Sequence, residues 1–149
     1  MRPELIVDVP FAVQKKVWVK KIYKPYFDHP FHFHKLCELT WIEKSHGKLI
    51  IGDYVGNFTD GELILVSPEL PHVWKCDAIY YKKRQDLYTK ALAIYFSIDI
   101  ISMISDESSS ISQFNDLIQR AERGLRFYGN TKKLVTDKIK EISESNGLF

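Results

Sequence analysis

The pattern of apolar and polar positions divides the chain near residue 105. Before that point, short segments rich in Val, Ile, Tyr, Phe and Trp alternate with Gly, Pro and Asp turn signals. This pattern predicts short strands over residues 11–22, 37–43, 48–51, 54–58, 62–66, 72–76 and 90–97. Strands this short and closely spaced favour an antiparallel sandwich or barrel.

After residue 105 the apolar period becomes helical. Apolar residues recur at steps of three and four positions, which predicts one amphipathic helix; they are Ile111, Phe114, Ile118, Ala121 and Leu125. A second helix is expected over 131–145, with an apolar face of Leu134, Val135, Ile139 and Ile142. Because the link over 126–130 is short, we expect the two helices to form a hairpin.

Composition places the chain among single globular domains. Its 149 residues are 45% hydrophobic and 27% charged, and the formal net charge of +2 gives no general attraction to nucleic acid or membrane surfaces. Two cysteines, Cys37 and Cys76, do not make a disulfide framework. The start lacks an apolar run of signal-peptide length, and the apolar-leaning stretch 91–104 is shorter than the ~20 residues of a membrane helix. We expect a soluble, cytoplasmic protein with no membrane contact.

The sharpest chemical feature is a set of three histidines and one carboxylate: His32, His34, Glu38 and His72. His-x-His on a strand places both imidazoles on one face, with Cα atoms ~6.6 Å apart. Glu38 would lie ~13 Å away on a straight strand, so a bend over 35–37 is needed to bring it to the same ion. Together the four side chains suit one divalent transition metal, Zn, Ni, Fe or Mn. Alternatively, they form a polar pocket floor joined by hydrogen bonds.

Side-chain alternation extends this candidate site to a ligand-binding surface. Thr40 shares the face of Glu38, and Trp74 shares the face of His72. An indole can stack on the apolar face of a sugar ring, although a buried core tryptophan is the alternative. With Tyr95 as a further lining residue, the predicted ligand-binding set is Glu38, Thr40, His72, Trp74 and Tyr95.

These residues resemble the paired motifs of the cupin superfamily. The first motif is matched by His32, His34, Glu38 and, after eight intervening residues rather than six, Gly47. The second is matched by Gly61 and His72, whereas Ser67, Glu69 and Cys76 stand where the motif has proline, glycine and asparagine. Such departures are common in cupins that bind rather than catalyse, so they argue against an enzyme more than against the fold.

A closer resemblance is to the N-terminal effector domain of AraC/XylS-type transcription regulators. It extends from about residue 11 to 142 and rests on four segments: 38–41 (Glu-Leu-Thr-Trp), 61–66 (Gly-Glu-Leu-Ile-Leu-Val), 70–74 (Leu-Pro-His-Val-Trp) and 121–129, with its Arg-Gly-Leu-Arg-Phe-Tyr-Gly ending. The resemblance implies a mostly β fold, a cupin-like antiparallel β-barrel (double-stranded β-helix, jelly-roll) followed by a C-terminal pair of α-helices.

The resemblance also implies a domain organisation. Residues 1–105 would form the barrel, with an N-terminal arm near 1–10, and 106–149 a helical hairpin for dimerisation. The dimerisation residues would be Ile111, Phe114, Ile118 and Leu125. In that family a helix-turn-helix domain follows; the chain stops at Phe149, so DNA contact is expected only through a domain absent from this chain.

The functional prediction is a sensing and dimerisation module rather than an enzyme. A small-molecule effector, with a sugar or sugar acid as the family-based guess, would bind in the barrel and rearrange the DNA-binding domains of a homodimer. The alternative is a small metal-dependent cupin enzyme, a dioxygenase or isomerase, which would use the three histidines and Glu38 as metal ligands.

Overall fold

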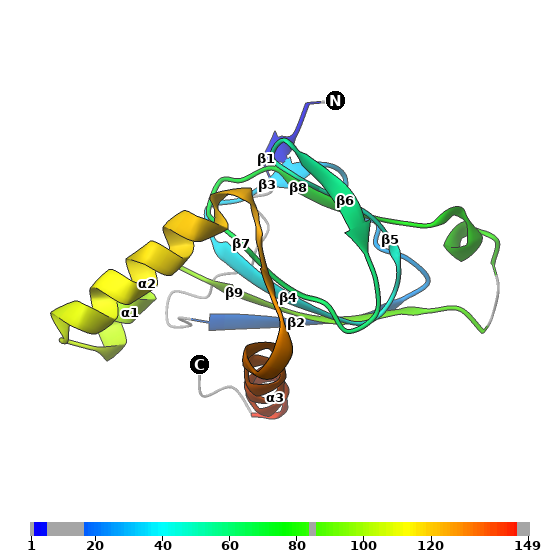
Figure 1. Ribbon diagram of the computed structural model, residues 1–149. Helices are drawn as coiled ribbons and strands as arrows, with labels where there is room; N and C mark the ends of the chain where they lie inside the picture. Colours follow the sequence, from blue (N-terminus) through cyan, green and yellow to red (C-terminus); the bar gives the residue numbers. More distant parts are fainter. Residues whose placement is uncertain (1, 6–16, 84–85, 146–149) are drawn as a thin grey trace.

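The computed structural model describes residues 2–5, 17–83 and 86–145. Over these residues the strands form two five-stranded sheets that face each other, with helices beside and below them (Figure 1). One sheet, sheet A, has the order β1 (Glu4–Leu5), β3 (His32–Phe33), β8 (His72–Cys76), β5 (Gly47–Ile51) and β6 (Tyr54–Phe58). The other, sheet B, has the order β10 (Leu125–Phe127), β7 (Leu63–Val66), β4 (Cys37–Lys44), β9 (Thr89–Phe96) and β2 (Val17–Lys24). All pairings are antiparallel except that of β1 with β3.

Alternation along the strands of sheet B gives it two buried faces. On β4, Ile42 belongs to the core between the sheets, whereas Leu39 and Trp41 pack on the opposite face. That outer face carries a second core, which includes Leu63 of β7 and Ile139 of the last helix. Because both faces of β7 are covered, its four residues are all buried and read as a continuous apolar run.

The helical part has three α-helices and two short 3-10 turns within the described residues. α3 (Gly129–Glu144) lies against the outer face of sheet B, where it buries Thr136 and Ile139, while α1 (Ile100–Ile104) and α2 (Ser108–Arg120) extend to one side of the sandwich (Figure 1). No residue of α2 is fully buried. The 3-10 turns are η1 (Ala78–Tyr81) and η2 (Ala121–Arg123).

The predicted fold class is confirmed, a mostly β jelly-roll type fold followed by helices. No ladder joins the two sheets over the described residues, so they form a sandwich rather than a hydrogen-bonded ring. Of the strand expected over 11–22, the residues up to 16 lie outside the described part; the rest belongs to β2. The expected N-terminal arm is described only over 2–5, where β1 pairs with β3.

The prediction of a helical hairpin was wrong. The helix that carries the apolar stripe ends at Arg120, and Leu125 lies on β10, where it pairs with Leu65 at the edge of sheet B. Gly124, with φ +77°, separates the turn from the strand in a conformation that favours glycine. The open edge of β7 then offers hydrogen-bond partners that no local pattern reveals. On the second helix, Leu134 points away from the core and is 65% exposed.

Over the described residues, no helix combines the length and the apolar content that crossing a bilayer requires.

The outer core is expected to carry a large part of the stability. Leu63 is fully buried between Trp41 and Phe127 in the sheet register, so Leu63→Ala should lower the free energy of unfolding by about 2–5 kcal/mol through lost burial and a cavity. Leu134→Ala is the matched control, with a change of about 0.5 kcal/mol or less. Denaturant unfolding measures both; equal effects would contradict the placement of the core.

Candidate metal centre

The four predicted metal ligands come together between the two sheets. His32 on β3 lies directly opposite His72 on β8, and Glu38 reaches them from β4 in the facing sheet. His34 lies in the turn that takes the chain from sheet A to sheet B, which is the bend the spacing required. All four residues are buried, and one ligand atom from each lies within 4.8 Å of the others.

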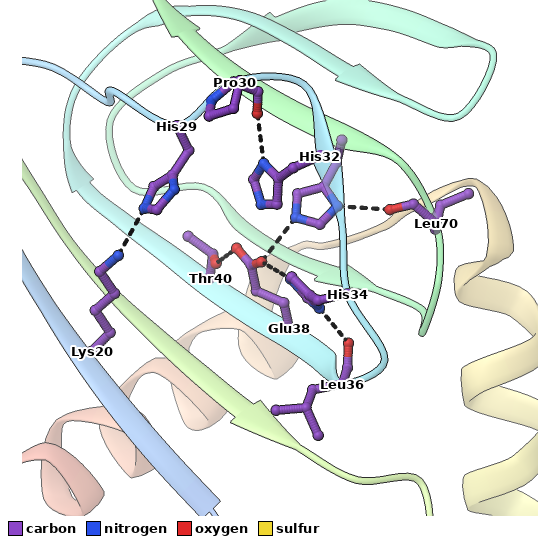
Figure 2. Close-up of polar contacts among 10 residues, drawn as sticks. Lys20, His29, Pro30, His32, His34, Leu36, Glu38, Thr40 and Leu70 are labelled. Carbon is purple, nitrogen blue, oxygen red and sulfur yellow. Dashed lines mark hydrogen bonds and ion pairs between the residues drawn. The ribbon is translucent and has the colours of Figure 1, made fainter. Parts of the chain in front are cut away.

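Backbone carbonyls orient all three imidazole rings (Figure 2). In each case Nδ1 faces the carbonyl oxygen of a residue two positions away: Pro30 for His32, at 2.6 Å, Leu36 for His34, at 2.9 Å, and Leu70 for His72, at 2.7 Å. A carbonyl oxygen only accepts, so each Nδ1 carries a proton and Nε2 is left for the cluster. Metal-binding histidines are commonly oriented in this way, by a hydrogen bond from the ring nitrogen that does not bind the metal.

Glu38 occupies the centre of the cluster. Its Oε2 lies 3.0 Å from Nε2 of both His34 and His72. Its Oε1 accepts a 2.7 Å hydrogen bond from the hydroxyl of Thr40. The carboxylate is therefore held in place from two sides, with an oxygen directed at two of the histidines.

The electrostatics of the cluster keep Glu38 ionised. Burial alone would raise its pKa, but the charge of His72 and the hydrogen bonds from His34 and His72 together hold the pKa well below its usual range. Burial likewise opposes the charged form of His72, yet the adjacent carboxylate raises the pKa of that imidazole. His72 thus donates to Glu38 from Nε2 and to Leu70 from Nδ1.

His32 has the opposite electrostatic character. Burial, and then the charge of His72, lower its pKa to about 4. At neutral pH this ring is uncharged, and because Nδ1 carries the proton, Nε2 presents a lone pair. The cluster therefore already holds one imidazole in the form that a metal requires.

The donor set fits a divalent transition metal. His32, His34, His72 and Glu38 would hold it with three imidazole nitrogens and one carboxylate oxygen, a combination that suits Zn, Fe, Mn and Ni. When bound, such an ion acts as a Lewis acid toward an oxygen ligand. The residues on the protein side contribute the orientation of the rings and the hydrogen bond from Thr40 to the carboxylate.

The structure brings Thr40 and Tyr95 to the cluster but places Trp74 further along the interior. Tyr95 pairs with Glu38 in the sheet register, and its ring lies 5.5 Å from that of His34. Trp74 packs against Phe27 and Phe58 in the core. Its indole N–H is buried and, among the described residues, has no hydrogen-bond partner.

Two residues beside the cluster were missed from the sequence. Lys20 on β2 donates to Nε2 of His29 at 2.9 Å, and the ring of His29 lies 5.4 Å from that of His32. The sequence feature that could have revealed Lys20 is the alternation of Trp18, Lys20 and Ile22, because alternation places the lysine on the same face of the strand as the two apolar residues.

The predicted dimerisation residues are split between two elements. Ile111, Phe114 and Ile118 are half-buried along α2, and the ring of Phe114 lies 6.2 Å from that of Phe96. Leu125, on β10, is not part of this helical stripe.

Solved structures with a similar fold were found, whereas no protein-family model and no curated protein sequence matches the chain. ToxT from Vibrio cholerae superposes with a TM-score of 0.52 at 16% identity, over 84% of this chain and 48% of that one. A ToxT structure from strain O395, bound to (E)-4-(8-methylnaphthalen-1-yl)but-3-enoic acid, has a TM-score of 0.49 at 16% identity over 89% and 50%. An oxalate decarboxylase variant from Bacillus subtilis has a TM-score of 0.44 at 13% identity over 91% and 32%.

The first of these likenesses confirms the cupin-type fold that the motifs predict. At 16% identity, this likeness concerns the fold and not the role of the chain. The chain spans about half the length of ToxT.

Proposed function

We propose that this chain is the ligand-sensing domain of a transcription regulator, with a metal centre at the base of its binding site. A small-molecule effector binds between the sheets beside the cluster, and α2 transmits the change. DNA-binding domains beyond the C-terminus respond to it, in the cytoplasm. The observation that carries this proposal is a loop that connects the cluster to α2.

That loop joins β7 to β8 and contacts both the cluster and the helix. The backbone N–H of Glu69 donates to the carbonyl of His34 at 2.7 Å, and the carbonyl of Leu70 accepts from His72. At the other end of the loop, the hydroxyl of Ser67 donates to the carbonyl of Ile118 in α2 at 2.7 Å. A shift of the histidines on binding therefore has a short physical route to the helix.

This route supports a population shift as the sensing mechanism. An effector changes the balance between two arrangements only if it binds one of them better. Here, binding that reorients His34 or His72 would move the loop through its hydrogen bonds and favour one placement of α2. The resulting coupling acts in both directions, so the placement of α2 also changes effector affinity.

The exposed sides of the helices support homodimerisation as part of the same proposal. Ile111, Phe114 and Ile118 on α2 are only half-buried by their own chain. On α1, Met103 and Ile104 are 53% and 73% exposed. A second copy that covers these residues would bury apolar area on both partners, and the placement of α2 would then set the geometry of the dimer.

The lining supports an effector with polar atoms. The hydroxyl of Thr40 donates to Glu38, and Tyr95 pairs with Glu38 in the sheet register. Further along the interior, the indole N–H of Trp74 is a buried donor with no partner among the described residues, and it is available to an acceptor on a ligand that extends that far. A sugar or sugar acid fits these donors and remains our choice of ligand class.

Hydrogen exchange tests the sensing route. Loading the protein with Zn²⁺ should change the exchange of α2 amides in the wild type, and Ser67→Ala should reduce that change while leaving Zn²⁺ binding intact. Ser110→Ala, at the far end of α2, is the matched control and should respond like the wild type. Zn²⁺ binding with no change in α2, or a full response in Ser67→Ala, would contradict the proposed route.

A metal-dependent cupin enzyme is the second candidate, favoured by the complete set of three histidines and one carboxylate. It predicts turnover by protein loaded with Fe²⁺ or Mn²⁺, measured as oxygen consumption or as isomerisation of small sugars and hydroxy acids. Turnover that disappears in His34→Ala would favour the enzyme. Metal binding without turnover, together with a response of α2, would favour the sensor.

A further inference from the structure

A lysine points into the space between the two sheets. On β2, Trp18 and Ile22 pack in the core between the sheets, whereas Val17 and Val19 pack in the outer core. Side chains alternate along a strand, so Lys20 shares the inner face with Trp18 and Ile22. Lys20 is half-buried, and its contact with the exposed His29 is open to solvent. The ammonium group therefore lies at the edge of the interior, where partial burial disfavours a charge that is not compensated.

Contacts place the ammonium group of Lys20 beside the cluster of His32, His34, Glu38 and His72 (Figure 2). Lys20 Nζ donates to Nε2 of His29 at 2.9 Å, and the ring of His29 contacts that of His32. An ammonium group only donates, so Nε2 of His29 accepts this hydrogen bond through its lone pair. His29 thus holds the lysine at the edge of the cluster without neutralising its charge.

The carboxylates around Lys20 are engaged elsewhere. Glu38 accepts hydrogen bonds from His34, His72 and Thr40. Asp28 is paired with Lys24 at 2.7 Å. Among the described residues, Lys20 therefore forms no ion pair, and a half-buried positive charge lies next to the cluster with only a neutral partner.

The sheet register provides a second polar group on the same row. Lys20 pairs with Ala93 on β9, and Ala93 pairs with Thr40 on β4. Two strand spacings separate Lys20 from Thr40, about 10 Å at the backbone. The residue between them in the register is Ala93, whose side chain is a single methyl group. Across β2, β9 and β4, the ammonium group of Lys20 thus lies on one side of Ala93, and Thr40 with its partner Glu38 lies on the other.

We propose that Lys20, held by His29, recognises the carboxylate of a small organic acid that binds against the histidine–glutamate cluster. This inference rests on the proposed function and narrows its effector to organic acids. A carboxylate would compensate the unpaired ammonium through a charge-assisted hydrogen bond, which is stronger than a neutral one. A divalent ion in the cluster would add positive charge beside Lys20 and further favour an anionic ligand over a neutral one.

Calorimetric titration with matched acids and amides tests the proposal. The probes are glycolate, succinate and benzoate, each compared with the corresponding amide, added to Zn²⁺-loaded protein. At least one acid should bind, and its amide at least about 10-fold more weakly. Lys20→Met should weaken binding of that acid by about 10-fold or more, as expected for loss of a hydrogen bond to a charged group, and Lys20→Arg should retain more affinity than Lys20→Met.

The control is Lys21→Met, which removes an exposed lysine from the outer face of the same strand and should leave acid binding unchanged.

Metal content and thermal unfolding, measured on every variant, separate this proposal from the one on which it rests. Normal Zn²⁺ content in Lys20→Met with weakened acid binding supports the role of Lys20. Binding of Zn²⁺ with no acid bound, equal affinity for acid and amide, or an unchanged affinity in Lys20→Met overturns it. Failure of the wild type to bind any metal would instead contradict the proposed metal centre, and titration of the metal-free protein then decides the role of Lys20 by the same comparisons.

Discussion

His34→Ala is expected to abolish tight metal binding. The wild type should bind about one Zn²⁺ ion per chain, because the four ligand atoms lie within 4.8 Å of one another and the rings are already oriented by backbone carbonyls. Losing a hydrogen-bond partner of a ligand typically costs 10–100-fold in metal affinity, so losing the ligand itself should cost at least about 100-fold. Competition with a chromophoric chelator measures the affinity.

His46→Ala is the matched control for this experiment. His46 pairs with Asp77 away from the cluster, so its loss should leave Zn²⁺ affinity unchanged. Equal Zn²⁺ affinity in the wild type and in folded His34→Ala would show that the four residues form a hydrogen-bonded polar cluster and not a metal site. Thermal unfolding of both variants without metal establishes that each is folded.

Gly47→Ala should destabilise the protein by about 3 kcal/mol, toward the upper end for overpacking. Gly47 begins β5 and pairs with Phe58 and Cys76 on its two sides. An added Cβ would collide with the carbonyl oxygen of Lys75 and would lie 2.7 Å from Cα of Cys76. These are backbone atoms of β8, so relief requires the two strands to separate, and β8 is the strand that carries His72.

Gly61→Ala separates this steric effect from backbone conformation. Gly61 has φ +85° and no atom within 4 Å of the position of an added Cβ, so its replacement should cost only the conformational strain, about 1 kcal/mol. Denaturant unfolding of the two variants compares them directly. A Gly47→Ala variant as stable as Gly61→Ala would contradict the close approach of β5 and β8.

The candidate site depends on the way the sandwich is assembled. His32 and His72 come from neighbouring strands of sheet A, whereas Glu38 comes from sheet B. The turn through His34 and Leu36 connects the two sheets and supplies both a ring and the carbonyl that orients it. Any change that shifts one sheet against the other therefore alters the cluster, as the proposed sensing mechanism requires.

The local sequence pattern was enough to predict most strands, because alternation of side chains and turn residues are both features of a few neighbouring positions. The expected segments 54–58 and 72–76 coincide with β6 and β8, and the bend before Glu38 followed from strand geometry alone. The two-residue strands β1 and β3 had no comparable signal. They are strands only because a neighbouring chain segment supplies their hydrogen bonds.

The sequence by itself determined the fold class, the helical nature of the C-terminal part and the membership of the histidine–glutamate set. It did so because periodicity and residue chemistry are properties of the chain. Only the tertiary structure decided that Leu125 joins sheet B, that Gly47 must lack a side chain and that Lys20 and His29 lie beside the cluster. Each of these depends on backbone or side-chain atoms from segments distant in sequence, and their positions are fixed only when the two sheets pack.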